Sequence, residues 1–343
     1  MYRHLLVPLD GTDLSVEVVG SAVALARSVG ARVTFFHVVP DHASSLSGEA
    51  DVVRLTSQDD YAYAYTGRAR ELLAKAEAAA RAFGVPCDSA HVVGDRPAAA
   101  IVEAARARHC DLIFMASHGR RTKLGMALAS ETLNVLMTAG MPVLVSASGD
   151  PQPPSHAIGL IRDEHRSLAA VMHAWMHALA RARAAGGVPD ARLMRAIVRY
   201  IQDFPLALHH PKEEQHLFRR LRERTESVSV ELDELERQHV RDRELVVELA
   251  RRVEALAAAG SDTATQVAQL DDAVKAYAAF LWEHMGREEG AILPAAQRYL
   301  TEADWAEIDA AFEQNRDPNF GGETEKEFRH LFSRIVNAAE AGR

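Results

Sequence analysis

The sequence predicts two domains, an N-terminal α/β domain with a doubly wound, parallel, five-stranded sheet and a C-terminal all-α domain folded as an antiparallel four-helix bundle. Three observations lead to this prediction. Strand-like and helix-like runs alternate in the first half of the chain, a proline-rich stretch follows, and four apolar stripes with helical spacing occupy the second half. A length of 343 residues also suits two domains better than one.

The first half alternates short apolar runs with longer helical ones. The strand-like runs are His4–Leu9, Arg32–Val39, Ser89–Val93, Asp111–Ala116 and Pro142–Ser146. The helical runs are Leu14–Val29, Arg68–Phe83, Pro97–Arg108 and Met126–Thr138. Because the strand-like runs are apolar without polar alternation, we expect a parallel sheet that is covered on both faces.

Glycines indicate where these helices end. Gly30, Gly84 and Gly140 stand where a C-terminal cap needs a left-handed backbone. The polar stretch Asp41–Gly67, which contains three tyrosines, is predicted to be irregular.

A proline-rich linker separates the two domains. Three prolines fall between residues 151 and 154, and they interrupt both strand and helix. We therefore place the α/β domain at residues 1–147, the linker at 148–155, the bundle at 156–300, and a short helix with a tail at 301–343.

The composition excludes several classes of protein. The formal net charge is −9, and neither half is basic, so we expect no nucleic-acid partner. No apolar run is long enough to cross a membrane, and we expect a cytoplasmic protein without a membrane partner. Two cysteines are too few for a disulfide framework or a thiolate metal site.

Four apolar stripes with steps of three and four residues predict the bundle helices. They are Ile161, His165, Leu168, Met172, Trp175, Leu179; Leu193, Ile197, Ile201, Phe204, Leu208; Leu232, Leu235, His239, Asp242, Val246, Leu249, Val253; and Leu270, Val274, Tyr277, Leu281, His284, Glu288, Ala291. Thr301 and Asp304 then have the spacing of a capping box that opens a fifth, shorter helix. A weakly amphipathic stretch, 325–338, lies in the tail.

The 16 histidines of the chain are its most unusual feature. Single histidines interrupt the apolar stripes at His165, His239 and His284, where a leucine would pack better. Two helices carry a His-x-x-x-Glu unit, His209–Glu213 and His284–Glu288, whose spacing puts both side chains on one helix face. Four imidazoles and two carboxylates therefore converge on the bundle axis.

This inventory matches two neighbouring metal ions. Each ion would take two imidazoles, and the two glutamates would bridge the pair. Imidazole with carboxylate suits iron, manganese or zinc, and the lack of thiolate argues against copper(I) or an iron–sulfur cluster.

The segments around these histidines resemble the hemerythrin HHE cation-binding family. They read DEHRSL, HHPKEEQHLF, ERQHVRD and HMGREEGAILP, and the resemblance covers residues 156 to about 300. It implies a centre of two non-haem iron ions, with open positions for dioxygen, nitric oxide or peroxide. The six-ligand pattern is more similar to the repair-of-iron-centres and bacterial HHE proteins than to the oxygen-carrying hemerythrins, which use five histidines and two carboxylates.

The segment HHPKEE contains two adjacent histidines and two adjacent glutamates, so two His-x-x-x-Glu pairs are possible. The family pattern aligns His209 with Glu213, and the competing register pairs His210 with Glu214. His216 lies seven residues after His209, on the same helix face. We interpret it as a residue at the edge of the apolar face, with support of a metal ligand as the alternative. Pro205 and Pro211 are expected to disturb the helix that carries these ligands.

The first half resembles the universal stress protein family over residues 1–147. The segments that carry the resemblance are VPLDGT, VGDRPAAAI and MASHGRRTKLGMALASETLNVL, with MPVLVSA at the end. In the nucleotide-binding branch, the family pattern is G-x-x-G, nine residues, then G with Ser or Thr. Here Ala116 and Ala129 replace two of the three glycines, so the sequence leaves ATP binding open.

The resemblance also implies where ATP would bind and how the chain would assemble. The expected ATP contacts are Asp10, Val38, Gly119 and Ser130. The resemblance implies a homodimer, which in this family often forms through the last strand, here Pro142–Ser146.

The function expected from the sequence is that of a stress-response protein whose di-iron centre senses or handles dioxygen, nitric oxide or peroxide. Two alternatives remain open. One is a di-iron oxidoreductase or a factor that repairs nitrosative or oxidative damage, and the other is a non-catalytic binding module whose dimer responds to metal or nucleotide. The sequence shows no Ser-His-Asp pattern, Walker loop or GxGxxG fingerprint for a hydrolase or dehydrogenase.

Overall fold

The computed structural model describes residues 2–40, 58–117, 120–122, 125–127, 130–147, 155–259 and 262–313. Contacts divide the chain into two compact groups, residues 1–152 with 282–294 and residues 153–281 with 295–343. Below, the α/β unit means the described residues up to 147, and the helical unit means the described residues from 155 to 313. Within the described residues, no helix is both long and apolar enough to span a membrane. The predicted linker and the tail stretch 325–338 fall almost wholly outside the described residues.

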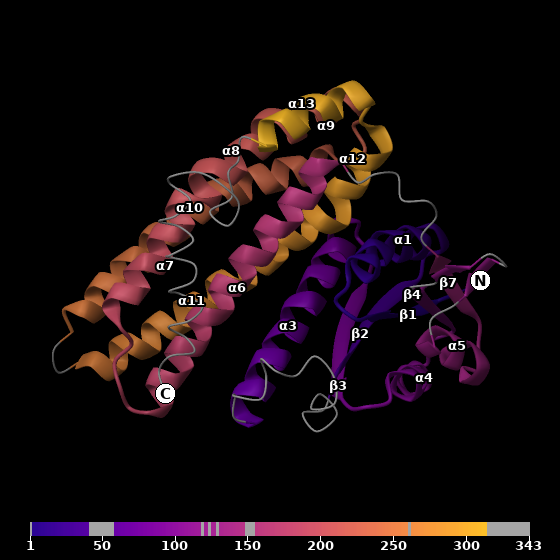
Figure 1. Cartoon of the computed structure of the whole chain (residues 1–343), viewed down its shortest axis with the longest axis horizontal. Coiled ribbons are helices and arrows are strands. Elements are labelled where there is room, and N and C mark those ends of the chain that lie inside the picture. Colours follow the sequence, from indigo (N-terminus) through magenta and orange to yellow (C-terminus); the bar gives the residue numbers. More distant parts are fainter. Residues whose placement is uncertain are drawn as a thin grey trace. The chain divides into compact units, whose positions relative to one another are not determined.

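The α/β unit is built on the predicted parallel sheet of five strands (Figure 1). The strands are β1 (His4–Leu9), β2 (Arg32–Val39), β3 (Cys87–Val93), β4 (Leu112–Ser117) and β7 (Val143–Ala147). Their order is β3-β2-β1-β4-β7, and every neighbouring pair is parallel. The order reverses between β1 and β4, which confirms a doubly wound sheet.

Helices cover both faces of this sheet. Helices α1 (Asp13–Val29) and α3 (Gln58–Ala82) bury their apolar side chains against one face, together with Leu5, Val7 and Phe35. Helices α4 (Pro97–Ala107) and α5 (Ser130–Thr138) pack on the other face. Burial on both faces explains why the strands read as continuous apolar runs.

The predicted helix ends are confirmed where glycine is needed. Gly30, Gly84 and Gly140 all have positive φ angles, between 64° and 68°. Gly30 caps α1, and its N–H donates to the carbonyl oxygens of Ala26 and Arg27.

Two elements of this unit differ from the prediction. Helix α3 begins at Gln58, inside the stretch predicted to be irregular, because residues 58–66 contain no proline or glycine and continue the alanine-rich helix that follows. The helix predicted from Met126 begins only at Ser130. Gly125–Ala127 (β6) instead pairs antiparallel with Arg120–Thr122 (β5), so a short hairpin precedes α5.

The helical unit contains four long helical segments that run alongside one another (Figure 1). They begin with α6 (His156–Ala184), α7 (Ala191–Asp203), α10 (Ser229–Ala257) and α11 (Thr263–Arg287). The apolar residues of the predicted stripes are nearly all buried, among them Trp175, Ile197, Leu235 and Leu281. The heptad-like spacing therefore identified the inward faces correctly.

The second and fourth segments continue beyond their α-helices through wider turns. After α7 come the π-helical turn η2 (Pro205–His209), α8 (His210–Lys212), the π-helical turn η3 (Glu213–Phe218) and α9 (Arg219–Arg224). After α11 come the π-helical turn η5 (Glu288–Ile292) and α12 (Leu293–Tyr299).

The predicted capping box opens the short helix α13 (Glu302–Glu313). The N–H of Asp304 donates to Oγ1 of Thr301, and Oδ2 of Asp304 accepts from the Thr301 N–H at 2.9 Å. Asp309 of α13 in turn accepts from the N–H of Ala157 at the start of α6. These contacts fix α13 across one end of the helical unit.

Candidate metal centre

Five histidines and two glutamates from all four helical segments converge inside the bundle. We call them the His/Glu cluster: His165, His209, His210, Glu213, His239, His284 and Glu288. All seven side chains are buried, with at most 4% of any residue exposed. The six residues that the sequence singled out are therefore brought together, and His210 joins them.

The cluster consists of overlapping groups whose ligand atoms lie within 4.8 Å of one another. One group contains His165 and His209, and a second contains His239 and His284. Glu213 and Glu288 belong to both groups. A third group joins His210 to His239 and His284.

The carboxylate of Glu213 faces both groups at once. Its Oε1 lies 3.2 Å from Nε2 of His209, and its Oε2 lies 3.5 Å from Nε2 of His239. Ligands about 2.1 Å from one ion are roughly 3 Å apart when they are neighbours around it. The two oxygens are thus spaced to serve two different ions.

The π-helical turns place these ligands. The N–H of His209 donates to the carbonyl oxygen of Phe204, five residues earlier, at 3.2 Å. Successive residues of a regular α-helix point about 100° apart, so two adjacent histidines would normally face different directions. The widened turn at Pro205 lets His209 and His210 both face the bundle interior, and similar turns begin at Glu213 and Glu288.

Two further carboxylates hold the histidine rings. Nδ1 of His209 donates to Oε2 of Glu164 at 2.5 Å, and Nδ1 of His239 donates to Oε1 of Glu214 at 2.7 Å. In each case Nε2 is left on the side of Glu213. A hydrogen bond to one ring nitrogen fixes the orientation and tautomer of the other, as is usual for metal-binding histidines.

The charges of the cluster influence one another. Burial disfavours the charged ring of His209, but Glu213 and Glu164 outweigh it and hold the pKa of His209 well above its usual value. The hydrogen bond from His239 lowers the pKa of Glu214. Burial raises the pKa of Asp242, whose Oδ2 lies 3.9 Å from Nε2 of His210, to about 6.

The two registers of the HHPKEE segment are not true alternatives. His209 belongs to the group of His165, whereas His210 belongs to that of His239 and His284. Glu213 lies in the cluster, and Glu214 supports His239 from outside it. His216 is a rim residue, as expected, and its ring lies 3.7 Å from Glu307 at the surface.

Sequence reasoning missed the outer partners of the cluster. Glu164 and Asp242 are buried carboxylates, 2% and 1% exposed. Glu164 directly precedes His165, and Asp242 follows His239 by three residues. Asp242 was visible as a charged residue inside an apolar stripe. Glu164 gave no such signal, because only its partner across the bundle explains its burial.

The donor set of the cluster fits two metal ions. Buried carboxylates need compensating positive charge, and imidazole with carboxylate suits iron, manganese or zinc. Neither cysteine takes part: Cys87 and Cys110 lie in the α/β unit, and burial raises the pKa of the Cys110 thiol to about 11.

Three of the four predicted nucleotide residues lie at the carboxyl edge of the sheet. Asp10 directly follows β1, Val38 is the last but one residue of β2, and Ser130 opens α5. Oδ1 of Asp10 accepts hydrogen bonds from the N–H and the hydroxyl of Thr12, which tie the carboxylate to the start of α1. Gly119 and Ala129 lie outside the described residues.

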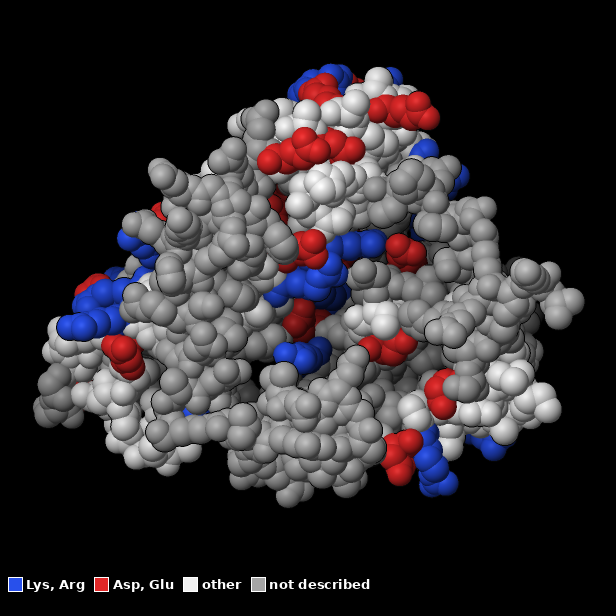
Figure 2. All heavy atoms as spheres, viewed as in Figure 1, with Lys and Arg blue, Asp and Glu red and all other residues white. Residues whose placement is uncertain are grey.

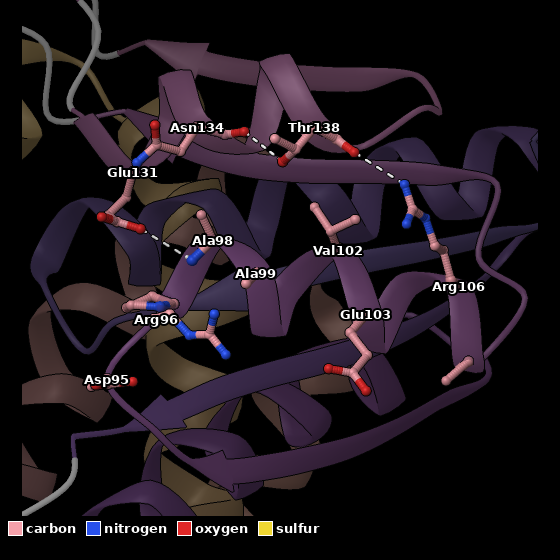
Figure 3. A pocket seen from close by; sticks show the side chains of 12 residues that line it. Asp95, Arg96, Ala98, Ala99, Val102, Glu103, Arg106, Glu131, Asn134 and Thr138 are labelled. Atoms are coloured by element: carbon pink, nitrogen blue, oxygen red, sulfur yellow. Dashed lines mark hydrogen bonds between the residues drawn. The ribbon is translucent and has the colours of Figure 1, made fainter.

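A separate pocket of about 820 Å³ lies between α4 and α5 (Figure 3). Glu131 accepts from the N–H of Ala98 at one end, and Arg106 donates to the carbonyl oxygens of Thr138 and Ala139 at the other. Among the predicted site residues whose side chains the structure describes, neither the six metal residues nor Asp10 and Val38 line it.

Acidic and basic side chains are interspersed on the described surface in Figure 2. Pairs such as Arg195–Glu254 and Arg241–Glu244 neutralise one another along the bundle helices.

Comparison with known proteins identifies the two halves. The universal stress protein family matches residues 1–146, and a Thermus aquaticus relative, "Universal stress protein in QAH/OAS sulfhydrylase 3'region", is 30% identical over 148 residues. These cover 98% of that relative and 42% of this chain. The chain belongs to the universal stress protein family. Its residues 156–296 match the hemerythrin HHE cation binding domain.

Two further proteins resemble the universal stress protein domain alone. Universal stress protein MJ0531 of Methanocaldococcus jannaschii is 28% identical over 42% of this chain and 82% of its own length. A crystal structure of a universal stress protein family member from Burkholderia pseudomallei is 24% identical and covers 43% of this chain and 97% of its own, with a TM-score of 0.35.

The support of His209 by Glu164 predicts a loss of metal affinity in Glu164→Gln. The substitution removes the negative charge behind the ring and leaves its size unchanged, and changes of this kind lower metal affinity by about 10- to 100-fold. Anaerobic titration with Fe²⁺ measures the effect. Glu254→Gln, which alters an exposed ion pair with Arg195, is the matched control. Equal affinity in Glu164→Gln and the control would contradict this role of Glu164.

Proposed function

We propose that the HHE domain binds two iron ions and that this di-iron centre senses or handles dioxygen, nitric oxide or peroxide under stress. The observation that carries the proposal is that Glu213 and Glu288 belong to both halves of the His/Glu cluster. A carboxylate shared by two groups of imidazoles is the arrangement that two neighbouring ions require.

The residues assigned to the centre divide into two sets. His165 and His209 would bind one ion, His239 and His284 the other, and Glu213 and Glu288 would bridge them. Two ions would supply positive charge and open coordination positions that the protein ligands do not fill. Glu164 and Glu214 orient His209 and His239 so that Nε2 faces the site.

The burial of the cluster favours small ligands. The cluster residues are at most 4% exposed, and aromatic rings of Phe204 and Phe218 flank His209 and His239. A diatomic molecule or peroxide is small enough to enter such a core, whereas a larger organic substrate would need the helices to separate. The same enclosure also suits an oxidoreductase or a damage-repair factor, so the response to small ligands must be measured.

Metal analysis of the purified chain tests the centre. We expect about two iron ions per chain, because the cluster provides two overlapping ligand groups. His209→Ala and Glu288→Ala should each lower that ratio, and His177→Ala, a half-buried histidine of α6 away from the stripe, should not. An unchanged ratio in both cluster variants would contradict the assignment.

The optical spectrum of the iron-loaded protein tests the proposed ligands. We expect nitric oxide or dioxygen to change the absorption of the reduced protein, because the protein ligands leave coordination positions open. His177→Ala should respond like the wild type. A reduced protein that contains two irons but gives no change with nitric oxide, dioxygen or peroxide would refute sensing and handling, leaving a structural centre.

We also propose that the universal stress protein domain binds ATP at the carboxyl edge of its sheet. The supporting observation is the reversal of strand order between β1 and β4, where parallel sheets usually bind ligands. Asp10 directly follows β1 and Ser117 ends β4, the two strands on either side of this reversal, and Gly119 and Ser130 follow in the chain.

A thermal shift experiment tests this nucleotide site. If ATP binds the folded domain, millimolar ATP should raise the unfolding temperature, because a ligand that binds only the native state stabilises it. Asp10→Ala should reduce the shift, and Asp95→Ala, at the separate pocket between α4 and α5, should retain it. An unchanged unfolding temperature of the wild type with millimolar ATP would contradict ATP binding by this domain.

A further inference from the structure

Helix α13 lies beyond the residues that match the HHE domain, and none of the proposed metal ligands belongs to it. The match ends at residue 296, whereas α13 spans Glu302–Glu313. The helix lies beside α9, at the end of residues 205–224 (Figure 1). We call residues 205–224 the ligand segment, because they carry His209 and Glu213.

Two arginines of the ligand segment bind carboxylates of α13. Nε and Nη2 of Arg224 donate to Oδ2 and Oδ1 of Asp304 at 2.8 and 2.9 Å. Only 3% of Asp304 is exposed, and Arg224 holds the pKa of this carboxyl well below its usual range. Three residues further along α13, Glu307 accepts a hydrogen bond from Nε of Arg220 at 2.9 Å. Such charge-assisted hydrogen bonds are stronger than those between neutral groups.

Lys212 extends these contacts to the other end of α13. Its Nζ donates to the carbonyl oxygen of Ala311 at 2.9 Å. The contacts from Arg224 to Lys212 thus follow one another in reverse order along α13, so the helix and the ligand segment run antiparallel. Ile308 and Phe312 are fully buried, and their apolar packing holds α13 in the same place.

Helix α13 also contacts the start of α6. Oδ1 of Asp309 accepts from the hydroxyl of Ser155 at 2.9 Å and from the N–H of Ala157 at 2.8 Å. Helix α6 carries His165, and the ligand segment carries His209. One short helix therefore joins the two elements that supply both imidazoles of one proposed metal position.

The ligand segment is a part of the bundle that needs such support. It contains two π-helical turns, which are rare, and helices in proteins depend mainly on tertiary contacts for their stability. The contacts of Lys212 and Arg220 with α13 lie on either side of the turn Glu213–Phe218. Helix α13 thus binds the irregular part of the segment from both of its ends.

We propose that α13 is a clamp that holds the ligand segment against α6, and that opening of this clamp sets the rate at which the position of His165 and His209 loses its ion. The effect on the ion rests on the proposed di-iron centre, whereas the clamp itself does not. The position of His239 and His284 takes its histidines from α10 and α11, so it should depend on the clamp only through Glu213.

Hydrogen exchange of the metal-free, full-length protein tests the clamp. The double variant Asp304→Ala/Glu307→Ala removes the two carboxylates that bind the ligand segment. We expect amides of residues 212–224 to exchange at least about tenfold faster than in the wild type, because lost charge-assisted hydrogen bonds make local opening easier. Amides of residues 232–253 in α10 should exchange at the wild-type rate.

Two further variants separate the clamp from a general effect on α13. Glu302→Ala/Glu313→Ala removes two carboxylates from exposed positions of the same helix, and it should leave the exchange of residues 212–224 unchanged. Glu307→Gln retains the capping box of Thr301 and Asp304, and it should accelerate the same amides by a smaller factor. It decides the question if the double variant does not fold.

Loss of iron to a chelator tests the effect on the metal. The full-length protein is loaded with Fe²⁺ without oxygen and mixed with an excess of a coloured Fe²⁺ chelator, whose absorbance is followed over time. The Asp304→Ala/Glu307→Ala variant should lose about one iron per chain at least about tenfold faster than the wild type, because ions leave through the locally opened state. Glu302→Ala/Glu313→Ala should lose iron at the wild-type rate.

The possible failures are distinguishable. Wild-type exchange of residues 212–224 in both Asp304→Ala/Glu307→Ala and Glu307→Gln would refute the clamp, whether or not metal binds. Faster exchange with an unchanged rate of iron loss would refute the role of the clamp in retaining the ion. If the wild type binds no iron, the proposed di-iron centre fails and the effect on the ion fails with it, whereas hydrogen exchange still decides the clamp.

Discussion

The structure of the helical unit depends on keeping two glutamates, Glu213 and Glu288, in an interior that water does not reach. An isolated buried carboxylate is costly, and a pair of them repel each other as well. Imidazoles from all four helical segments surround the pair, and Glu164 and Glu214 brace two of those rings from outside. Two bound cations would neutralise the pair, so the polar core is consistent with a bundle built to hold metal.

This requirement accounts for the irregular helices. An apolar core is best packed by regular helices, whereas a core in which seven buried His and Glu side chains meet needs side chains at positions that a regular helix does not supply. The π-helical turns at Pro205, Glu213 and Glu288 occur where ligands are needed, in the two segments that carry a His-x-x-x-Glu unit. Pro205 and Pro211 lie in the first of these segments, where missing N–H groups favour the wider turns.

Much of this could be predicted from sequence because it depends on periodicity. The strands β1 and β2, the glycine caps and the apolar stripes follow from residue type and spacing. The six residues predicted to be metal ligands follow from the same spacing together with the resemblance to the HHE family. The exceptions depend on contacts between distant segments. The hairpin before α5 needed pairing between Arg120 and Ala127, and Glu164 is explained only by His209, 45 residues away. The two alternative assignments, His209 with Glu213 or His210 with Glu214, both assumed a regular helix. The π-helical turn that begins at Pro205 instead lets both histidines face the interior.

The central claim is that one core holds two metal ions that share Glu213 and Glu288. Anomalous diffraction from crystals of the iron-loaded protein, recorded on both sides of the iron absorption edge, tests it most directly. The account predicts two iron peaks inside the bundle, each within bonding distance of Glu213 and Glu288, one beside His209 and the other beside His239. A single peak, or two peaks that do not share these glutamates, would contradict it.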